Sequence, residues 1–450
     1  MRLYGEYQTE SERVCMSISR HVSDNGNPFP ETKNVIESMV EPGNLMAALR
    51  RVVSNKGCAG VDGREVSELE PYLVKYWDTI KQDLLKGTYY PKPVLKIEID
   101  KPGGGTRPLG IPTVLDRFIQ QALNQVLSPI FEPEFSDNSY GFRPGRSAHH
   151  AILKAREYQR KGRRWVVDMD LKQFFEEVNH DVLIAIIRRK INDRRVLRLI
   201  RSYLRSGVMY GGVCTARVKG TPQGGPLSPL LSNILLNELD MELIRRGHNF
   251  CRYADDCNIY IRSKRAGERV FKSIARFVER KLKLKVNYRK SAVARPWKRT
   301  FLGLSFTFHK KSRIRVPEET LKKGRAKLKA LFRKGRGRNV GRFIKEDLNP
   351  VLIGWINYFR ISETKGFAED LDSWIRRRLR AIFWRQWKRP WTRLRNLMKL
   401  GLSERQAVMS AFNNRGPCFN SGASHMNLAL PKKYFANLGL VSVLDRLNCF

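Results

Sequence analysis

The sequence lacks the features that mark several large classes of protein. Its seven cysteines are scattered and form no C-x-x-C pair, so they indicate neither a zinc knuckle nor a disulfide framework, and they fit a reducing compartment. No apolar run approaches the roughly 20 residues of a membrane span, and the opening MRLY does not read as a signal peptide. The G-x-x-x-x-G-K-[ST] spacing of a Walker loop is also absent, which disfavours ATPase chemistry.

Acidic residues are scarce relative to basic ones. The chain of 450 residues holds 85 Lys and Arg against 43 Asp and Glu, which gives a net charge of +42. A charge this large makes a polyanion the expected partner, and nucleic acid is the most common one. Because 42% of the residues are hydrophobic and 10% aromatic, the chain is expected to fold, with length enough for two or three domains.

The acids that are present gather at the ends of short apolar segments. Residues 252–260 read RYADDCNIY and predict a strand–turn–strand with Asp255 and Asp256 at the turn, while residues 165–170 read WVVDMD and predict a strand that ends in Asp170. Adjacent carboxylates repel each other, so an ordered pair usually has a cation to neutralise it. If strand and hairpin are neighbours, the three acids share a metal site; the alternative is an exposed hairpin tip.

Glycine-rich and basic loops occur between the apolar segments. Residues 95–109 (LKIEIDKPGGGTRPL) predict a hairpin whose tip has no side chains, with Lys101 and Arg107 on its arms. Such a hairpin suits phosphate binding; the alternative is a solvated basic surface. Residues 138–147 mix aromatic residues with arginine, a composition that suits nucleic-acid bases and backbone. Gly224 and its neighbouring glycine leave a loop backbone that a substrate can approach.

Several helices are predicted as well. One covers roughly residues 35–49, one 116–127, one begins at Ser228 and ends near Gly247, and a basic one starts at about 266; a short strand is expected at 301–306. Residues 321–400 hold 23 Lys and Arg against 6 Asp and Glu, and predict a helical bundle with a cationic face toward an anionic helix. The arginines expected on that face are Arg376, Arg377, Arg380 and Arg385. The alternative is a charged face that contacts only solvent.

Five sequence blocks follow one another in the order typical of reverse transcriptases. They are GFRPGRS at 141–147, the strand through Asp170 with two phenylalanines after it, PQGG at 222–225, YADD at 253–256 and FLG at 301–303. Over residues 35–450 the chain resembles a group II intron-encoded reverse transcriptase, or maturase. RYADDCNIY, GWINYF at 354–359 and the tail from Trp374 are similar to the compact bacterial lineage found with group IIC introns.

The resemblance implies an α+β fold of the right-hand polymerase type. Residues 1–60 would be an N-terminal extension, 61–315 the fingers and palm with an antiparallel sheet, 316–395 the helical thumb and 396–450 a C-terminal DNA-binding domain. No H-N-H endonuclease block follows, so insertion would use a pre-existing DNA 3′ end.

The resemblance also implies roles for individual residues. Asp170, Asp255 and Asp256 would be catalytic and, together with Leu171, would hold two Mg²⁺ ions. The residues that would contact the incoming dNTP are Lys101, Arg107, Phe175 as the gate under the sugar, Gln223, Gly224 and Lys290, the last as a proton donor to pyrophosphate. Arg143 and Arg146 would touch the template.

The expected function is RNA-directed DNA synthesis for retrotransposition, with binding of the intron RNA to assist splicing. The expected partners are a group II intron RNA, an RNA template with a DNA or RNA primer, a DNA target and dNTPs. No membrane is involved, the oligomeric state is open, and the location would be the bacterial cytoplasm near the nucleoid. The alternatives are a reverse transcriptase of another role (retron, diversity-generating or defence-linked) and a non-enzymatic RNA-binding splicing factor.

Overall fold

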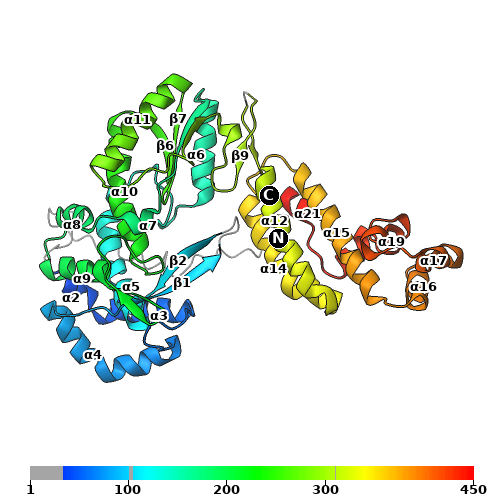
Figure 1. Ribbon diagram of the computed structural model, residues 1–450, viewed down its shortest axis with the longest axis horizontal. Coiled ribbons are helices and arrows are strands. Elements are labelled where there is room, and N and C mark those ends of the chain that lie inside the picture. The colour runs from blue at the N-terminus through cyan, green and yellow to red at the C-terminus, as the bar shows by residue number, and fades with distance from the viewer. Residues whose placement is uncertain (1–33, 101–104, 310, 450) are drawn as a thin grey trace, which may run out of the picture. The chain divides into compact units, whose positions relative to one another are not determined.

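The computed structural model describes residues 34–100, 105–309 and 311–449 (Figure 1). The chain forms two compact units, each assembled from separate segments. The first unit contains Met1–Ser136, Gln173–Leu239 and Arg280–Lys285, and the second contains Asp137–Lys172, Asp240–Glu279 and Val286–Phe450. No helix within the described ranges is both long and apolar enough to cross a membrane.

The first unit has a four-stranded sheet in the order β2-β1-β4-β5. Strand β1 (Val94–Asp100) pairs antiparallel with β2 (Thr106–Ile111), which confirms the predicted basic hairpin. Lys101, which is predicted on one arm of this hairpin, lies outside the described residues. On its other side β1 runs parallel to β4 (Val208–Tyr210), which in turn pairs antiparallel with β5 (Val213–Thr215).

The first unit also contains helices, and α5 shows why they form where they do. It spans Val114–Phe131, Thr113 caps it by accepting a hydrogen bond from the Asp116 backbone N–H, and its apolar side chains are buried. The single helix predicted over 35–49 is wrong: the chain makes two helices, because Pro42 lacks the N–H that would continue the first one. The helices of this unit are α2 (Val35–Met39), α3 (Pro42–Ser54), α4 (Leu69–Lys86), α5, α7 (Phe174–Glu177), α8 (His180–Arg188), α9 (Arg194–Arg205) and most of α10 (Ser228–Arg245).

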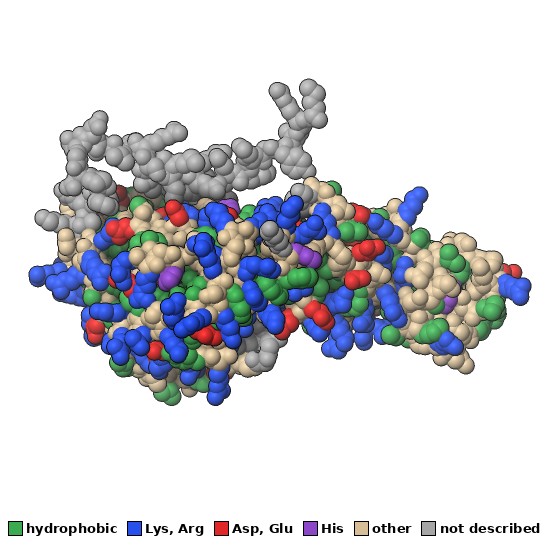
Figure 2. All heavy atoms as spheres, turned by 90° about the horizontal axis from the view of Figure 1, so that it is seen from above, with side chains coloured by type: hydrophobic (Ala, Val, Ile, Leu, Met, Phe, Trp, Pro, Cys, Tyr) green, Lys and Arg blue, Asp and Glu red, His purple; other side chains and the backbone are tan. Residues whose placement is uncertain are grey.

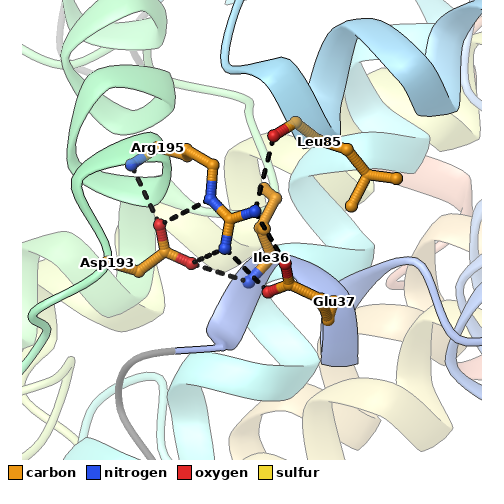
Figure 3. A network of polar contacts seen from close by, with 5 residues as sticks. All are labelled: Ile36, Glu37, Leu85, Asp193 and Arg195. Carbon is orange, nitrogen blue, oxygen red and sulfur yellow. Dashed lines mark hydrogen bonds and ion pairs between the residues drawn. The ribbon is translucent and has the colours of Figure 1, made fainter.

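A polar network joins three of these helices (Figure 3). The Arg195 guanidinium, at the start of α9, donates to both carboxylate oxygens of Glu37 on α2, at 2.6 and 2.8 Å, and to Asp193. Asp193 also accepts from the Ile36 backbone N–H, and Arg195 reaches the Leu85 carbonyl near the end of α4. The arginine thus serves several acceptors at once, which its planar fork of donors permits.

The second unit is built on an antiparallel sheet in the order β6-β7-β3-β8. Helix α6 (Ala148–Arg160) buries Ala151, Ile152 and Ala155 in one hydrophobic core with side chains of the sheet, and α11 (Lys264–Arg280) follows β7. The four strands are β3 (Trp165–Met169), β6 (Asn249–Tyr253), β7 (Asp256–Ile261) and β8 (Ala292–Ala294). The predicted strand and hairpin are both present, and largely antiparallel sheets together with helices confirm the α+β class.

The strand expected at 301–306 is wrong in its first half. Phe301 and Leu304 exchange both backbone hydrogen bonds around a tight turn in which Leu302 and Gly303 have φ of 50° and 75°. Only β9 (Ser305–Phe306) is extended, and it pairs with β10 (Ile314–Arg315). Left-handed residues end a strand, so the turn takes the place of the first residues.

The C-terminal part of the second unit is helical and shares one hydrophobic core. Buried residues from Leu328 to Leu447 belong to this core, which continues across the predicted domain boundary at 395. Leu371, Ile375 and Leu379 are buried at helical spacing, as predicted. The helices are α12 (Glu318–Lys334), α13 (Val340–Arg342), α14 (Asn349–Phe359), α15 (Gly366–Gln386), α16 (Pro390–Lys399), α17 (Glu404–Ala411), α18 (Pro417–Asn420), α19 (Ser424–Ala429), α20 (Lys432–Asn437) and α21 (Val443–Asn448).

Candidate active site

The acidic hairpin has a two-residue turn. Tyr253 at the end of β6 pairs with Asp256 at the start of β7, so Ala254 and Asp255 form the turn itself. The Ala254 φ of 55° is left-handed, as tight hairpin turns require, although Gly or Asn adopts such a conformation at less cost. Asp255 therefore projects from a constrained turn at the end of a sheet whose strands are largely buried.

The register of β3 against β7 brings the third acid to the same end of the sheet. Met169 pairs with Cys257, so Asp170, the next residue, follows β3 at the level where Asp256 begins β7. Opposed residues on antiparallel strands have Cα atoms roughly 5 Å apart. The expected neighbourhood of strand and hairpin is confirmed.

Asp170 is held by two residues that sequence reasoning missed. Its Oδ2 accepts a hydrogen bond of 2.7 Å from the Asn287 side-chain amide, and its backbone N–H donates to the Ser291 hydroxyl at 3.0 Å. The Asn287 backbone N–H in turn donates to the Asp170 carbonyl. Leu171, the next residue, is buried and forms a backbone bridge with Val286. These partners lie more than 100 residues downstream, where no local pattern marks them.

The carboxylates perturb one another electrostatically. Asp256 keeps part of its surface open to solvent, yet the surrounding protein and then the charges of Asp255, Asp168 and Asp170 raise its pKa to about 7. Burial raises the pKa of Asp255, and the charge of Asp170 raises it further. Burial also raises the pKa of Asp168, against the opposing effect of its ion pair with Arg299. Each acid is thus held near others of the same charge.

The donor set suits a divalent cation, which relieves this repulsion. As the side chains are oriented in the part of the chain that the structure describes, no three His, Cys, Asp or Glu residues form a group that could hold a metal ion. The backbone brings Asp170 and Asp256 to adjoining strand ends with Asp255 in the turn. The residues present therefore fit a metal in kind and in backbone position.

Lys290 is exposed and lies close enough to the acids to affect them. Its positive charge lowers the pKa of both Asp255 and Asp256, although other effects outweigh it. The Arg299 guanidinium donates to the Lys290 backbone carbonyl at 2.7 Å, which fixes this part of the chain. The role that the resemblance implies for Lys290, a proton donor to pyrophosphate, stays a prediction.

The other residues assigned to the nucleotide belong to the first unit. The Gln223 carbonyl accepts a hydrogen bond from the Gly110 N–H, and a Cβ on Gly224, whose φ is 132°, would lie 2.6 Å from the Gly110 carbonyl oxygen. Gly224 is therefore required for contact of its loop with β2, the strand that carries Arg107. The Phe175 ring is partly buried against Phe174, with ring centroids 5.1 Å apart.

The two arginines assigned to the template differ in exposure. Arg143 is buried and donates to the Ser139 carbonyl, so it shapes its own loop. Arg146 is partly exposed and pairs with Asp137 at 2.6 Å. The guanidinium of Arg146 therefore has the freer access to a nucleic acid.

The arginines of α15 do not all face outward. Arg377 and Arg385 are exposed and Arg376 is partly exposed, as expected. The prediction that Arg380 lies on the same face is wrong, because its side chain is buried and donates twice to the Leu430 carbonyl at 2.9 and 3.0 Å. Burial, together with the charge of Arg376, lowers the pKa of Arg380 to about 10.

Basic side chains cover much of the remaining surface. Figure 2 shows Lys and Arg spread over the face in view, with fewer Asp and Glu among them. Such a distribution is the electrostatic footprint of a nucleic-acid-binding protein. An antiparallel sheet that carries acids at adjoining strand ends, in a chain this basic, is the arrangement expected of a right-hand nucleic-acid polymerase.

Comparison with known proteins identifies the family within this class. The family model described as reverse transcriptase (RNA-dependent DNA polymerase) matches residues 99–306, and the group II intron maturase-specific domain matches residues 321–401. Protein YkfC of Escherichia coli (strain K12) is 34% identical over 307 residues, which cover 59% of this chain and 81% of that protein. The chain belongs to the group II intron-encoded reverse transcriptases and maturases, and it is an RNA-directed DNA polymerase.

Two further relatives have names that refer to introns. The group II intron-encoded protein LtrA of Lactococcus lactis subsp. cremoris is 37% identical over 243 residues, 53% of this chain and 40% of LtrA. An uncharacterized 91 kDa protein in the cob intron of Schizosaccharomyces pombe is 38% identical over 196 residues, 44% of this chain and 24% of that protein. The chain thus spans less than half the length of these two relatives. A solved Cas6-RT-Cas1–Cas2 complex, 22% identical over 55% of this chain and 42% of that chain, has a TM-score of 0.37, too low to support an argument.

Proposed function

We propose that this protein copies an RNA template into cDNA from a DNA or RNA primer, with a group II intron RNA as its partner in splicing and retrotransposition. The observation that carries the proposal is the register of β3 against β7, which brings Asp170 level with Asp256 beside the Asp255 turn. The maturase-specific domain over residues 321–401 supports the intron RNA as partner.

In the proposed reaction a primer 3′-hydroxyl attacks the α-phosphorus of a dNTP, and pyrophosphate leaves. The proposed cofactor is a pair of Mg²⁺ ions, which lower the pKa of the hydroxyl and stabilise the charge that develops on the phosphorus. Asp170, Asp255, Asp256 and Leu171 would hold the metal. Asn287 orients Asp170 by its 2.7 Å hydrogen bond, so the chain contributes mainly position and charge.

Roles for the nucleotide contacts follow the same proposal. Phe175 would exclude a ribose 2′-hydroxyl, and Gln223 and Gly224 would contact the nucleotide along a loop fixed to β2. Lys290 would donate a proton to the leaving pyrophosphate. Lys101 and Arg107, on the basic hairpin, would bind the triphosphate.

The helical part is proposed to bind nucleic acid. An exposed aromatic cluster on α16 and α17 supports this: Trp391 is 68% exposed, and its ring lies 5.2 Å from that of Phe412 at an angle of 84°. Residues 388–415 around it hold seven Lys and Arg against the single acid Glu404. Aromatic faces in cationic surroundings stack with unpaired bases. Figure 2 shows hydrophobic side chains at the surface on the right of the view, where Figure 1 labels α16 and α17.

Primer extension on an RNA template with dNTPs and Mg²⁺ tests the proposal. Asp255→Asn is expected to reduce extension by several orders of magnitude, because a neutral amide is a poor ligand for a hard cation. RNA affinity in EDTA is expected to stay within about twofold, since basic residues supply the affinity. Asp78→Asn, which neutralises an exposed acid on α4, is the matched control.

Three outcomes would each contradict part of the proposal. Undiminished extension by Asp255→Asn would remove this residue from the metal site. A wild-type protein that binds a group II intron RNA but extends no primer at any Mg²⁺ concentration would instead be a non-enzymatic splicing factor. Equal affinity for the intron RNA and for an unrelated structured RNA of the same length would remove the intron as the specific partner.

A further inference from the structure

The turn that carries Asp255 requires support from outside itself. Ala254 has a φ of 55°, a left-handed conformation that costs a residue with a Cβ free energy. Two-residue hairpin turns usually contain Gly or Asn in such a position, and this turn contains neither. Such a conformation persists where the surrounding structure holds it.

One buried side chain supplies that support. Arg252 is fully buried, and its Nη1 donates a 2.9 Å hydrogen bond to the Ala254 carbonyl, within the turn. Its Nη2 donates to the Ser139 hydroxyl at 2.7 Å. The same guanidinium forms an ion pair with Asp240 on α10, where Nε lies 2.8 Å from Oδ1 and Nη2 lies 2.6 Å from Oδ2. Both side chains are fully shielded from solvent, so each charge depends on the other.

The backbone on the other side of the hairpin fits closely around the same turn. Tyr140 donates its N–H to the Arg252 carbonyl at 2.9 Å, and the Arg252 N–H donates to the Asn138 carbonyl at 2.8 Å. A Cβ on Gly141 would lie 2.3 Å from the Ala254 backbone nitrogen. Contacts on two sides therefore leave the Ala254 peptide little freedom.

We propose that Arg252 and Asp240 are a positioning pair that sets the orientation of Asp255, although neither touches substrate or metal. Asp240 fixes the guanidinium plane, the guanidinium fixes the Ala254 carbonyl, and the next residue along the chain is Asp255. The inference rests on the proposed role of Asp255 as a metal ligand.

Experiments can distinguish a positioning role of this ion pair from a role in stability alone. A buried ion pair can often be replaced as a pair by apolar residues of similar volume without loss of stability, whereas removal of one partner leaves an unpaired buried charge. The double variant Asp240→Leu with Arg252→Met therefore removes the donor to Ala254 while keeping the core filled. The matched control is Glu242→Leu with Arg246→Met, a neighbouring ion pair whose acid is also on α10.

Five quantities are measured on the full chain: the unfolding midpoint, RNA affinity in EDTA, Mn²⁺ affinity from electron paramagnetic resonance, and kcat and KM for a dNTP. The double variant is expected to keep its midpoint and RNA affinity near the wild-type values. Its kcat should fall about a hundredfold with KM nearly unchanged, as a small misplacement of a catalytic group does. Mn²⁺ affinity should fall about tenfold, as it does on loss of outer partners of a metal ligand. The control should match wild type throughout.

A conservative variant keeps the test decisive if the double variant does not fold. Arg252→Lys retains a charge opposite Asp240, but one ammonium cannot serve Asp240, Ala254 and Ser139 together, so partial loss of kcat and of Mn²⁺ affinity is expected. The inference would be overturned if the double variant kept the wild-type kcat and Mn²⁺ affinity. If the double variant does not fold, the same result in the lysine variant would overturn it. If the wild-type protein extends no primer, the proposed function fails, while the Mn²⁺ titration still tests the pair.

Discussion

Gly220 lies against the backbone of Phe175 and Glu176, and its replacement gives a quantitative test of the proposed gate. The Gly220 N–H donates to the Val178 carbonyl at 2.7 Å, and the adjacent Thr221 N–H donates to the Phe175 carbonyl at 2.6 Å. Its φ is 90°, and a Cβ there would lie 2.8 Å from the Glu176 carbonyl oxygen and 2.9 Å from that of Phe175. Gly220→Ala is therefore expected to push this segment away from α7.

The cost can be worked out from these distances. A left-handed conformation costs a residue with a Cβ about 1–2 kcal/mol, and overpacking against backbone adds about 1–3 kcal/mol. Alanine also lowers the conformational entropy of the unfolded chain, which stabilises the folded state by about 0.4–1 kcal/mol. A net loss of about 1 to 4.6 kcal/mol in local stability follows, which corresponds to roughly 5- to 2,000-fold faster amide exchange at about 1.4 kcal/mol per factor of ten.

Gly212→Ala is the matched control. Gly212 has a φ of 84° and lies in the same unit, and a Cβ added there would meet nothing within 4 Å. Only the conformational cost, reduced by the unfolded-chain effect, applies at this position, so the local loss should be about 0–1.6 kcal/mol. Hydrogen exchange followed by mass spectrometry on peptides covering 173–182 and 208–222 measures both variants.

The functional readout is discrimination between dNTPs and ribonucleotides. Phe175→Ala removes the ring and is expected to admit ribonucleotides, and Gly220→Ala should move in the same direction by displacing the ring. Exchange in Gly220→Ala no faster than in the Gly212 control would refute the steric reasoning. Unchanged discrimination in Phe175→Ala would show that the gate is elsewhere.

Two further predictions concern charge. The double variant Arg377→Gln with Arg385→Gln should flatten the dependence of log affinity on log salt by roughly 0.7–0.9 for each phosphate that it no longer neutralises. Arg380→Gln should instead lower stability and leave that slope unchanged, because Arg380 is buried. An unaltered slope in the double variant would assign those two arginines to solvent. Since the pKa of Asp256 is raised to about 7 in the metal-free protein, stability in EDTA should fall as pH rises from about 4 to about 7, and Asp256→Asn should remove that part of the dependence. Thermal unfolding against pH measures it, and a variant with the wild-type profile would refute the assignment.

The sequence by itself determined the local elements and the family. Alternating apolar residues around Asp170 and around the Asp255 turn are sufficient to form strands, because a strand and a tight turn depend on near neighbours. Leu371, Ile375 and Leu379 recur at helical spacing and predict a buried stripe for the same reason. The order of five short motifs along the chain is enough to indicate a reverse transcriptase, which the family match confirms.

Only the tertiary structure decided which distant residues meet. The pairing of β3 with β7 puts Asp170 level with Asp256, and the segment after α11 supplies Asn287 to hold Asp170; neither follows from local periodicity. Burial of charge was decided at the same level. Arg380 is expected on a cationic surface, yet both Arg380 and Arg252 are buried, because the Leu430 carbonyl and Asp240 satisfy their donors. A buried cation is stable only where such partners converge, and that convergence is a property of the folded chain.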